Sequence, residues 1–339
     1  MDAKKTNRPF AVLSRHAAAL GYVLRVVLPV ILRTGRRPVI FSRLIGMGDI
    51  ICTVPAALEL KKRHPGATFI YNCQADFAAV PRMAGLASQI TSFSAIGLVG
   101  HWYDFLLGGF YHFMHGDDTP GQTSQASMVE EFCRQFDVPV TEEHALLTID
   151  PALREKAETI LRGKNLDPKS LVIIHPGPSW PVREWPAEKW PQLVAGLRAA
   201  GFTSIAQLGV GRYANFGEVE LATVPGAVSL INQLSLEEAF AVISLARLHI
   251  GIDSGLLHVA ATVGTPGVGI FGMTSPQFRF SREYRRSFVV SEVECQGCYH
   301  RLPRIDWVTN CPYDIRCMKE IGVDRILQVC LSKLNPTAR

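Results

Sequence analysis

The sequence predicts an α/β protein made of two domains. Short, strongly apolar segments alternate with segments of helical length along most of the chain, which is typical of parallel sheets covered by helices. With 339 residues, of which 47% are hydrophobic, the chain is long enough for two domains with separate cores. Glycine-bearing loops follow several of the apolar segments, where open α/β sheets bind their ligands.

The net charge and the cysteine content indicate which ligands and which cellular location to expect. A net charge of +5 favours phosphorylated substrates or an acidic membrane surface, and no nucleic-acid-binding motif is present, so nucleic acid is not expected as a partner. Cys52, Cys73 and Cys133 are scattered through apolar or helical settings, as in reduced intracellular proteins. We therefore expect a cytoplasmic location.

Residues 1–37 are predicted to form a basic amphipathic extension. Its apolar part, Phe10–Leu32, is interrupted by charge and by Pro29, which disfavours a cleavable signal peptide, and Arg25 disfavours a helix that spans a bilayer. Two interpretations stay open. The helix lies on an anionic membrane, which would give a peripheral contact at the inner face of the cytoplasmic membrane, or it packs on the domain that follows.

The first domain is expected over residues 38–165. Its predicted strands are Val39–Ser42, Thr68–Cys73, Gln89–Phe93 and Tyr103–Leu107. Its predicted helices are Ile50–His64, Ala75–Ala84 and Met128–Phe136, with a glycine loop over Arg43–Asp49 and a long loop over His115–Ser127.

The second domain is expected over residues 166–339. A helix over Ala152–Gly163 and a connector over Lys164–Ser170 lead into it. Its predicted strands are Leu171–His175, Thr203–Leu208 and Leu248–Ile252, and its predicted helices are Glu188–Ala200, Leu236–Ser244 and Ile321–Leu334.

The stretch from Leu248 to Pro276 organises this second domain. A buried strand is followed by Asp253, Ser254 and Gly255, where Ser254 can cap the next helix and Gly255 lets a ligand approach the backbone. His258, four residues after Ser254, shares that face of the helix. Free N–H groups at a helix start bind anions, so this segment predicts a site for a phosphorylated ligand.

Three ordered windows together resemble the ADP-heptose:lipopolysaccharide heptosyltransferase family, glycosyltransferase family 9. The windows are RLIGMGDIICTVPAAL from Arg43, IHPGPSWPVREWPAEKW from Ile174, and GIDSGLLHVAA from Gly251 followed by Thr265-Pro266 and Phe271-Gly272. The resemblance implies the GT-B architecture, in which two Rossmann-like domains face across a cleft, with the nucleotide-sugar donor in the second and the acceptor mainly in the first.

The resemblance also implies site residues. Asp49 matches the family's proposed catalytic base, with Gly46 and Gly48 beside it in the acceptor-side loop; the alternative for Asp49 is a helix N-cap. Ser179 and Arg183 match contacts to the donor diphosphate, and the donor-site motif supplies Asp253, Ser254, Gly255 and His258. No catalytic metal or other cofactor is expected, because the helix dipole and the basic side chain stabilise the leaving diphosphate.

Four cysteines stand apart from these motifs. Cys295, Cys298, Cys311 and Cys317 have the spacing C-x2-C-x12-C-x5-C, which suits a tetrahedral structural site for zinc or iron. The cluster resembles that of the autotransporter-modifying heptosyltransferases of the same family. Free thiols or two local disulfides remain the alternatives.

The function expected from the resemblance is inverting transfer of heptose or a related sugar from an ADP-sugar to a lipopolysaccharide-core or other glycan or glycolipid acceptor. Two alternatives remain: a protein O-heptosyltransferase, suggested by the cysteines, and an inactive nucleotide-binding scaffold. Asp49, Arg183 and Asp253 together argue against the scaffold, since a module that only binds needs no base.

Overall fold

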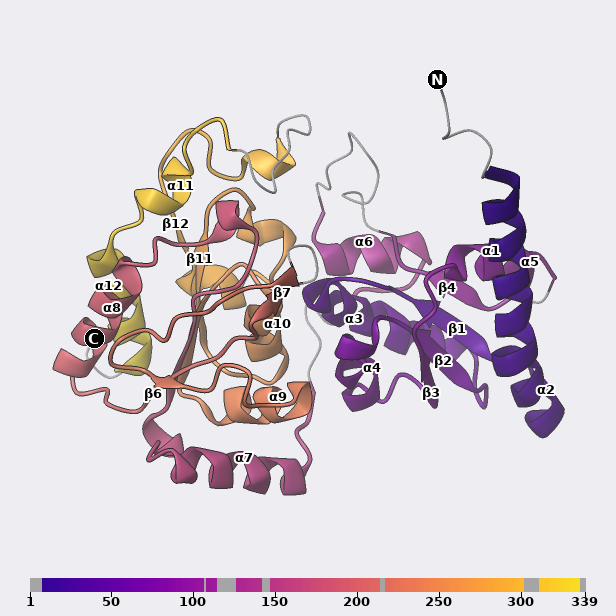
Figure 1. Cartoon of the computed structure of the whole chain (residues 1–339), viewed down its shortest axis with the longest axis horizontal. Helices are drawn as coiled ribbons and strands as arrows, with labels where there is room; N and C mark the ends of the chain where they lie inside the picture. Colours follow the sequence, from indigo (N-terminus) through magenta and orange to yellow (C-terminus); the bar gives the residue numbers. More distant parts are fainter. Residues whose placement is uncertain are drawn as a thin grey trace. The chain divides into compact units, whose positions relative to one another are not determined.

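The structure, a computed structural model, describes residues 8–106, 108–114, 126–141, 147–213, 217–301 and 311–335. The chain divides into two compact units (Figure 1). The first comprises Met1–Met114 and Phe132–Thr141, and the second comprises His115–Glu131 and Glu142–Arg339. Each unit contains its own parallel sheet with helices packed on it, so the prediction of two α/β halves is confirmed.

The first unit is built on a four-stranded parallel sheet in the order β3-β2-β1-β4. Its strands are β1 Val39–Ser42, β2 Phe69–Asn72, β3 Gln89–Thr91 and β4 Phe110–His112. Successive side chains of a strand point to opposite faces. Ile40 and Ile70 accordingly belong to the core on one face, while Phe41 and Tyr71 contact each other on the opposite face.

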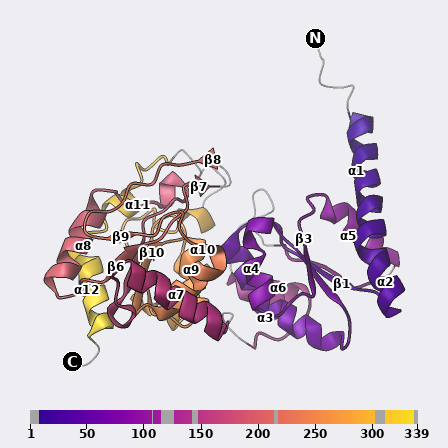
Figure 2. The ribbon, with the colours of Figure 1, turned by 60° about the horizontal axis from the view of Figure 1, so that its bottom comes forward.

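The N-terminal segment forms one long helical rod beside this sheet (Figures 1 and 2). It consists of α1 Arg8–Tyr22, a π-helical turn Val23–Val27 and α2 Leu28–Thr34. Its buried side chains share a cluster with β1, β2 and α5 (Ile96–Leu106). The members from the rod are Ala19, Tyr22, Val27 and Val30, and those from the sheet and α5 are Ile40, Ile70, Ile96, Val99 and Tyr103.

A polar contact and a ring contact add to this packing. The Tyr22 hydroxyl bonds to Thr91 Oγ1 at 3.1 Å, and the Tyr22 ring stacks on Phe93 with centroids 5.0 Å apart. The rod is therefore part of the first unit. The predicted division at residue 37 differs from the observed one because one face of the segment completes the core of the sheet it precedes.

Two other expectations for the first unit are corrected. The helix α3, Met47–Arg63, starts three residues before the predicted one and has Gly46 at its N-cap position, so Asp49 lies in the first turn and is not the N-cap. The predicted strand Tyr103–Leu107 is wrong, because the residues through Leu106 are the last turn of α5. The strand of this region is β4, which follows Gly108 and Gly109, whose φ angles are +67° and +89°.

The remaining short elements before the second sheet are a 3-10 turn Ala75–Phe77, α4 Ala79–Met83 and α6 Met128–Gln135. The predicted loop His115–Ser127 falls almost wholly outside the described residues.

The second unit is built on a six-stranded parallel sheet in the order β12-β11-β10-β5-β6-β9. Its strands are β5 Val172–His175, β6 Ile205–Gln207, β9 Val228–Ser229, β10 Leu248–Ile252, β11 Gly267–Phe271 and β12 Val289–Val290. A small antiparallel ribbon pairs β7 Arg212–Tyr213 with β8 Gly217–Glu218. All residues of β5, β10 and β11 are buried, and for β5 and β10 this follows from the apolar runs that predicted them.

Helices cover both faces of this sheet (Figure 1). The helices are α7 Pro151–Gly163, α8 Lys189–Ala199, α9 Leu236–Leu245, α10 Gly255–Thr262, α11 Arg316–Lys319 and α12 Val323–Leu334. The core on one face joins α8 and α12 to β5, β10 and β11 and includes Trp185 and Trp190, two of the three tryptophans of the second sequence window.

The boundary between the units also differs from the predicted one at residues 165 and 166. The helix α7 packs on α9, and the Lys156 ammonium lies 2.7 Å from the Glu238 carboxylate. The segment that was expected to close the first domain therefore belongs to the second unit.

Candidate functional site

The residues predicted for the acceptor side gather in the first unit, where β1 leads into α3. Gly46 has φ +81°, and a Cβ there would come within 2.9 Å of the Asp49 carboxyl carbon. The close turn at Gly46 therefore needs glycine, both for its backbone conformation and for space. Gly48 lies in the first turn of α3 beside Asp49.

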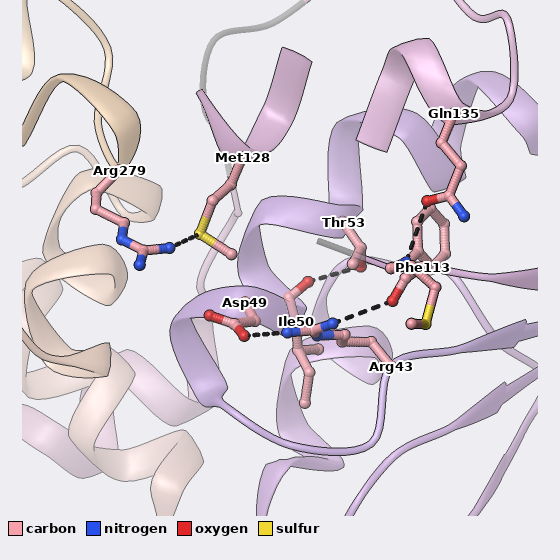
Figure 3. Close-up of polar contacts among 9 residues, drawn as sticks. Arg43, Asp49, Ile50, Thr53, Phe113, Met128, Gln135 and Arg279 are labelled. Carbon is pink, nitrogen blue, oxygen red and sulfur yellow. Dashed lines mark hydrogen bonds and ion pairs between the residues drawn. The ribbon is translucent and has the colours of Figure 1, made fainter. Parts of the chain in front are cut away.

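Asp49 forms an ion pair with Arg43 through its Oδ2 atom (Figure 3). Arg43 is almost buried, with 8% of its side chain exposed, whereas the Asp49 side chain is 31% exposed. Arg43 Nη1 also donates to the Phe113 carbonyl at 3.2 Å, and its guanidinium lies over the Phe132 ring. Arg43 thus holds one oxygen of a carboxylate that stays accessible to solvent.

In the second unit, Asp253 of the predicted donor site lies among residues from the carboxyl ends of three adjacent parallel strands. His175 ends β5, Asp253 directly follows β10, and Thr274 lies three residues after β11. All three side chains are buried. Because the carboxyl ends of parallel strands meet at one edge of a sheet, residues from distant windows of the sequence come together here.

Asp253 is the most heavily contacted acidic group of this edge. Its Oδ2 accepts a hydrogen bond from Thr274 Oγ1 at 2.6 Å and lies 3.3 Å from Arg183 Nη1. Burial by itself raises the pKa of the Asp253 carboxyl, but the charges of Arg183 and Arg279 and the Thr274 bond outweigh it, so the pKa is below its ordinary value. Asp253 therefore remains an anion that holds Arg183.

Trp180 holds the same arginine from another side. The Arg183 guanidinium carbon lies 4.0 Å from the centre of the Trp180 ring, which is a close cation–π distance. Trp180 in turn contacts the Tyr299 ring, with centroids 6.2 Å apart. Val182, Met273 and Cys298 form a small buried cluster beneath this loop.

Ser254 occupies the N-cap position of α10, as predicted, but its side chain makes no capping bond. Its Oγ instead shares a 3.0 Å hydrogen bond with His175 Nδ1. Burial lowers the pKa of His175 to about 4, so the ring is neutral at pH 7. The N–H groups of the first turn of α10 are thereby left without a side-chain cap, which suits an anion site.

The other predicted donor residues have structural contacts. The backbone N–H of Ser179 donates to Glu184 Oε1 at 2.9 Å, which braces the loop that carries Arg183. Gly255 is the first residue of α10, and His258 on the same helix is buried and stacks on Phe280 with centroids 4.1 Å apart. His258 also lowers the pKa of Asp253 through its charge.

The four cysteines of the predicted metal site influence one another. The pKa of Cys317 is raised to about 12 by burial and then by the negative charges of Cys295, Cys298 and Cys311. Gly297, between the first two cysteines, has φ +69°, and the Ile315 N–H lies 3.4 Å from Cys311 Sγ. Among the described residues, however, no group of three or more His, Cys, Asp or Glu side chains is arranged to hold a metal ion.

Sequence reasoning missed Trp180, Glu184, Thr274 and His175 as members of this site. Thr274 and His175 could have been found by the rule that named Asp253, since both lie at the carboxyl ends of neighbouring strands. Trp180 and Glu184 offered no such signal, because their contacts depend on how the loop after β5 folds back on itself.

Comparison with known proteins gives a family match and several structural relatives. The model of glycosyltransferase family 9 (heptosyltransferase) matches residues 110–307. Lipooligosaccharide heptosyltransferase 2 of Haemophilus influenzae is 29% identical over 152 residues, a match that covers 42% of this chain and 42% of that protein. The aligned region is thus less than half the length of that curated relative.

Solved structures extend the similarity to most of the chain. The iron-containing dodecameric glycosyltransferase TibC of enterotoxigenic E. coli has a TM-score of 0.66 at 17% identity, covering 89% of this chain and 77% of TibC. The E. coli ADP-heptose lipopolysaccharide heptosyltransferase II has a TM-score of 0.63 at 15% identity, covering 89% of this chain and all of that one (100%). At these identities the likeness shows the fold, which is of the GT-B type.

Proposed function

The chain belongs to glycosyltransferase family 9, the heptosyltransferases, and on that premise we propose that it transfers a heptose or related sugar, with inversion, from an ADP-sugar to a glycan acceptor. The acceptor that we propose first is a lipopolysaccharide-core precursor. The observation that carries the proposal is the cluster of Arg183, Asp253 and Thr274 at the edge of the second sheet, beside the uncapped start of α10.

This cluster suits a diphosphate leaving group. Arg183 supplies a positive charge, and the first-turn N–H groups of α10 supply donors that favour an anion. Asp253 would repel a phosphate if it acted alone, so we assign it the role of holding Arg183 in position. Ser179, Ser254, Gly255 and His258 complete the proposed donor site. The reaction then needs no catalytic metal, because these groups stabilise the negative charge that develops on the diphosphate.

Asp49 is the proposed base. An acceptor hydroxyl must lose its proton as it attacks the sugar carbon, and a carboxylate that is partly exposed can take it. The ion pair with Arg43 occupies Oδ2 and fixes the orientation of the carboxylate, and the second oxygen points away from Arg43 in Figure 3. Gly46 lets the turn close around this group, and Gly48 lies beside it in the first turn of α3.

The variant Asp49→Asn tests the assignment. It keeps the shape of the side chain but cannot accept the proton, so turnover should fall about 10²–10⁴-fold while the affinity for ADP is unchanged. The matched control is Asp76→Asn, an exposed aspartate of the same unit, which should retain full activity. Transfer rate, ADP affinity by calorimetry and the thermal midpoint are measured on all three proteins.

An active Asn variant would remove Asp49 from the mechanism. The next candidates would then be His112, at the end of β4, and Asp117, which lies outside the described residues. A wild-type protein that binds ADP but transfers no sugar would instead favour the inactive scaffold.

A protein hydroxyl is the second candidate acceptor. It is favoured by the four cysteines and by the structural likeness to TibC. A mass-spectrometric screen of the purified protein against ADP- and UDP-sugars, with lipid-linked and protein acceptors, distinguishes the two. Mass added only to a protein acceptor would overturn the lipopolysaccharide-core assignment.

We also propose that Cys295, Cys298, Cys311 and Cys317 hold one structural zinc or iron ion with no part in the chemical step. The packing of Cys311 against the buried Cys298 and the N–H to sulfur contact at Cys311 support this. As they lie, the described residues do not form a metal site, so the thiols would have to move closer together. Protein purified without chelator should contain about one metal ion per chain, and less than about a tenth of that would favour free thiols or disulfides.

The proposed place of action is the cytoplasm, at the inner face of the cytoplasmic membrane. A lipid-linked acceptor would require the enzyme to work there. The basic and apolar composition of the first 37 residues supports a peripheral contact.

A further inference from the structure

The long N-terminal rod has a row of exposed leucines. Leu20, Leu24, Leu28 and Leu32 are spaced four residues apart and are 60%, 52%, 38% and 77% exposed. Residues four apart lie on one side of a helix. We call these four residues the leucine face. Exposed leucines are unremarkable singly, but a continuous row of them indicates a contact surface.

The opposite side of the rod is anchored in the first unit. Tyr22, Val27 and Val30 are buried against the sheet and α5, and Tyr22 also bonds to Thr91. Among the described residues, Ser14–Thr34 is the stretch that is long and apolar enough to cross a bilayer. To cross one, the rod would have to leave the sheet and expose Ile40 and Ile70, so the packing favours a helix that lies on a surface.

The charged residues around the leucine face indicate which kind of surface it contacts. From Ala3 to Gly48 the sequence contains no aspartate or glutamate. The basic residues in this stretch are Lys4, Lys5, Arg8, Arg15, Arg25, Arg33, Arg36, Arg37 and Arg43. Arg25 and Arg33 are exposed on the rod itself. A surface that is both apolar and cationic fits an anionic bilayer, where each basic residue adds to the attraction.

A cavity with basic lining residues lies next to the C-terminal end of the rod. Arg36 and Arg37 directly follow α2, and together with His64 they line a cavity of about 370 Å³. The other lining residues are Pro38, Val39, Pro65, Ala67, Gly108 and Gly109, none of which is acidic. Two guanidinium groups beside a cavity suit the phosphate of an anionic headgroup.

We propose that the leucine face is a membrane-docking surface, with the rod lying in the plane of an anionic bilayer and Arg25, Arg33, Arg36 and Arg37 contacting headgroup phosphates. This extends the proposed function, because a lipid-linked acceptor is what would place the enzyme at the membrane. The leucines then enter the region between headgroups and acyl chains, and the first unit stays folded on the rod.

Vesicle co-sedimentation tests the surface. The wild type should bind vesicles that contain phosphatidylglycerol, bind phosphatidylcholine vesicles far less, and lose binding as salt rises from about 0.05 M to about 0.5 M. Leu24→Glu/Leu28→Glu should weaken partitioning by about a hundredfold or more, since each buried leucine contributes about tenfold. The matched control is Val140→Glu, which alters an exposed valine of the same unit and should bind as the wild type does.

The depth of position 24 in the bilayer distinguishes a rod that lies in the membrane plane from one that crosses the membrane. Leu24 is at the middle of Ser14–Thr34, so in a spanning helix it would lie at the bilayer centre. The fluorescence of Leu24→Trp, after subtraction of the wild-type signal, should be quenched more by lipids brominated near the headgroup than by lipids brominated near the chain ends. Stronger quenching from the chain ends would overturn the in-plane arrangement.

Further outcomes would overturn the proposal outright. Vesicle binding that survives Leu24→Glu/Leu28→Glu would place the membrane contact elsewhere. A lipid-free dimer that the same variant dissociates, without vesicle binding by the wild type, would assign the leucine face to a second copy of the chain. ADP calorimetry on the same proteins tests the proposed function separately from the membrane contact. A wild-type protein that does not bind ADP would contradict the proposed function, whereas the vesicle experiment would still decide whether the leucine face contacts a membrane.

Discussion

Two side chains, those of Asp253 and Trp180, fix the position of the Arg183 guanidinium. Asp253 lies 3.3 Å from its guanidinium and the Trp180 ring lies 4.0 Å from it. A long cationic side chain that is fixed in this way loses less entropy when it binds a phosphate. We therefore expect Trp180 to act as a positioning residue for Arg183 within the proposed donor site.

The pair Trp180→Ala and Trp180→Phe measures this contribution. A cation–π contact of about 0.5–2 kcal/mol corresponds to a loss of roughly two- to thirtyfold in ADP affinity for the Ala variant, and Phe should restore part of it. Arg183→Ala alone should weaken affinity about ten- to a hundredfold. Calorimetry on the double variant completes the cycle. Equal losses from Trp180→Ala with and without Arg183 would show that the indole acts independently of the arginine.

Two buried histidines should make stability depend on pH. Burial lowers the pKa of His175 to about 4 and that of His249 to about 3, and neither ring nitrogen of His249 has a hydrogen-bond partner in the described structure. The unfolded chain takes up protons near pH 6.5, whereas the folded protein does not. The contribution of these two histidines to the free energy of unfolding is therefore fully present above pH 6.5, and it is lost as the pH is lowered from 6.5 towards 4.

Each histidine contributes a slope of about 1.4 kcal/mol per pH unit in this window, so the two together contribute about 2.8 kcal/mol per pH unit. His249→Leu should remove about half of that slope in urea unfolding at a series of pH values. The control His16→Gln changes an exposed histidine and should leave the slope as it is. An unaltered slope in His249→Leu would mean that this ring is protonated in the folded protein.

At the scale of elements, the N-terminal rod has two faces with different energetic roles. Tyr22 is buried against β3 and the sheet core, whereas Leu24, two residues further on, is 52% exposed. Tyr22→Ala should cost about 3–5 kcal/mol because it leaves a cavity, and Leu24→Ala should change stability by no more than about 0.5 kcal/mol. Urea titration of both variants checks this pair. Similar effects of the two substitutions would mean that the rod is not packed on the sheet through Tyr22.

The elements also show what the sequence could and could not predict. The strands Val39–Ser42 and Leu248–Ile252 were predicted to the residue, because a buried parallel strand reads as an unbroken apolar run. The predicted strand Tyr103–Leu107 is wrong because Tyr103 is buried together with Ile96 and Val99, whose spacing in the sequence is that of one face of a helix.

The candidate site divides in the same way. Asp253 and Ser254 follow from a general rule about the ends of parallel strands, and the structure places both at that edge. The same rule places His175 at this edge, but its bond to Ser254 also depends on the order of the strands in the sheet. The contact of Trp180 with Arg183 depends on a loop that turns back over itself, and no sequence pattern predicts it.

At the scale of the whole molecule, the two units have separate cores, so a ligand that binds one unit should stabilise that unit and leave the other unchanged. The proposed donor residues belong to the second unit, so ADP should stabilise that unit by mass action. At a hundred times its dissociation constant the gain is about 2.7 kcal/mol, or roughly 5–10 °C in the midpoint of a unit of this size. Differential scanning calorimetry with and without ADP should show a shift in one transition.

The Tyr22→Ala variant identifies the other transition, since it weakens the first unit alone. Arg183→Ala should remove most of the ADP shift and leave the transition marked by Tyr22→Ala where it was. A single transition that moves both with ADP and with Tyr22→Ala would show that the two units unfold together.

The π-helical turn Val23–Val27 keeps the two ends of the rod facing the same way. Such a turn accommodates one residue more than an α-helical turn does. Residues seven apart return to the same face of a regular α-helix, whereas Ala19 and Val27, and likewise Tyr22 and Val30, are eight apart and still share one cluster. Loss of a single valine from the turn would let the rod continue as a regular α-helix with both pairs on the same face. A one-codon deletion should therefore be better tolerated inside this turn than in the middle of α1, where it would rotate everything before it by about 100°.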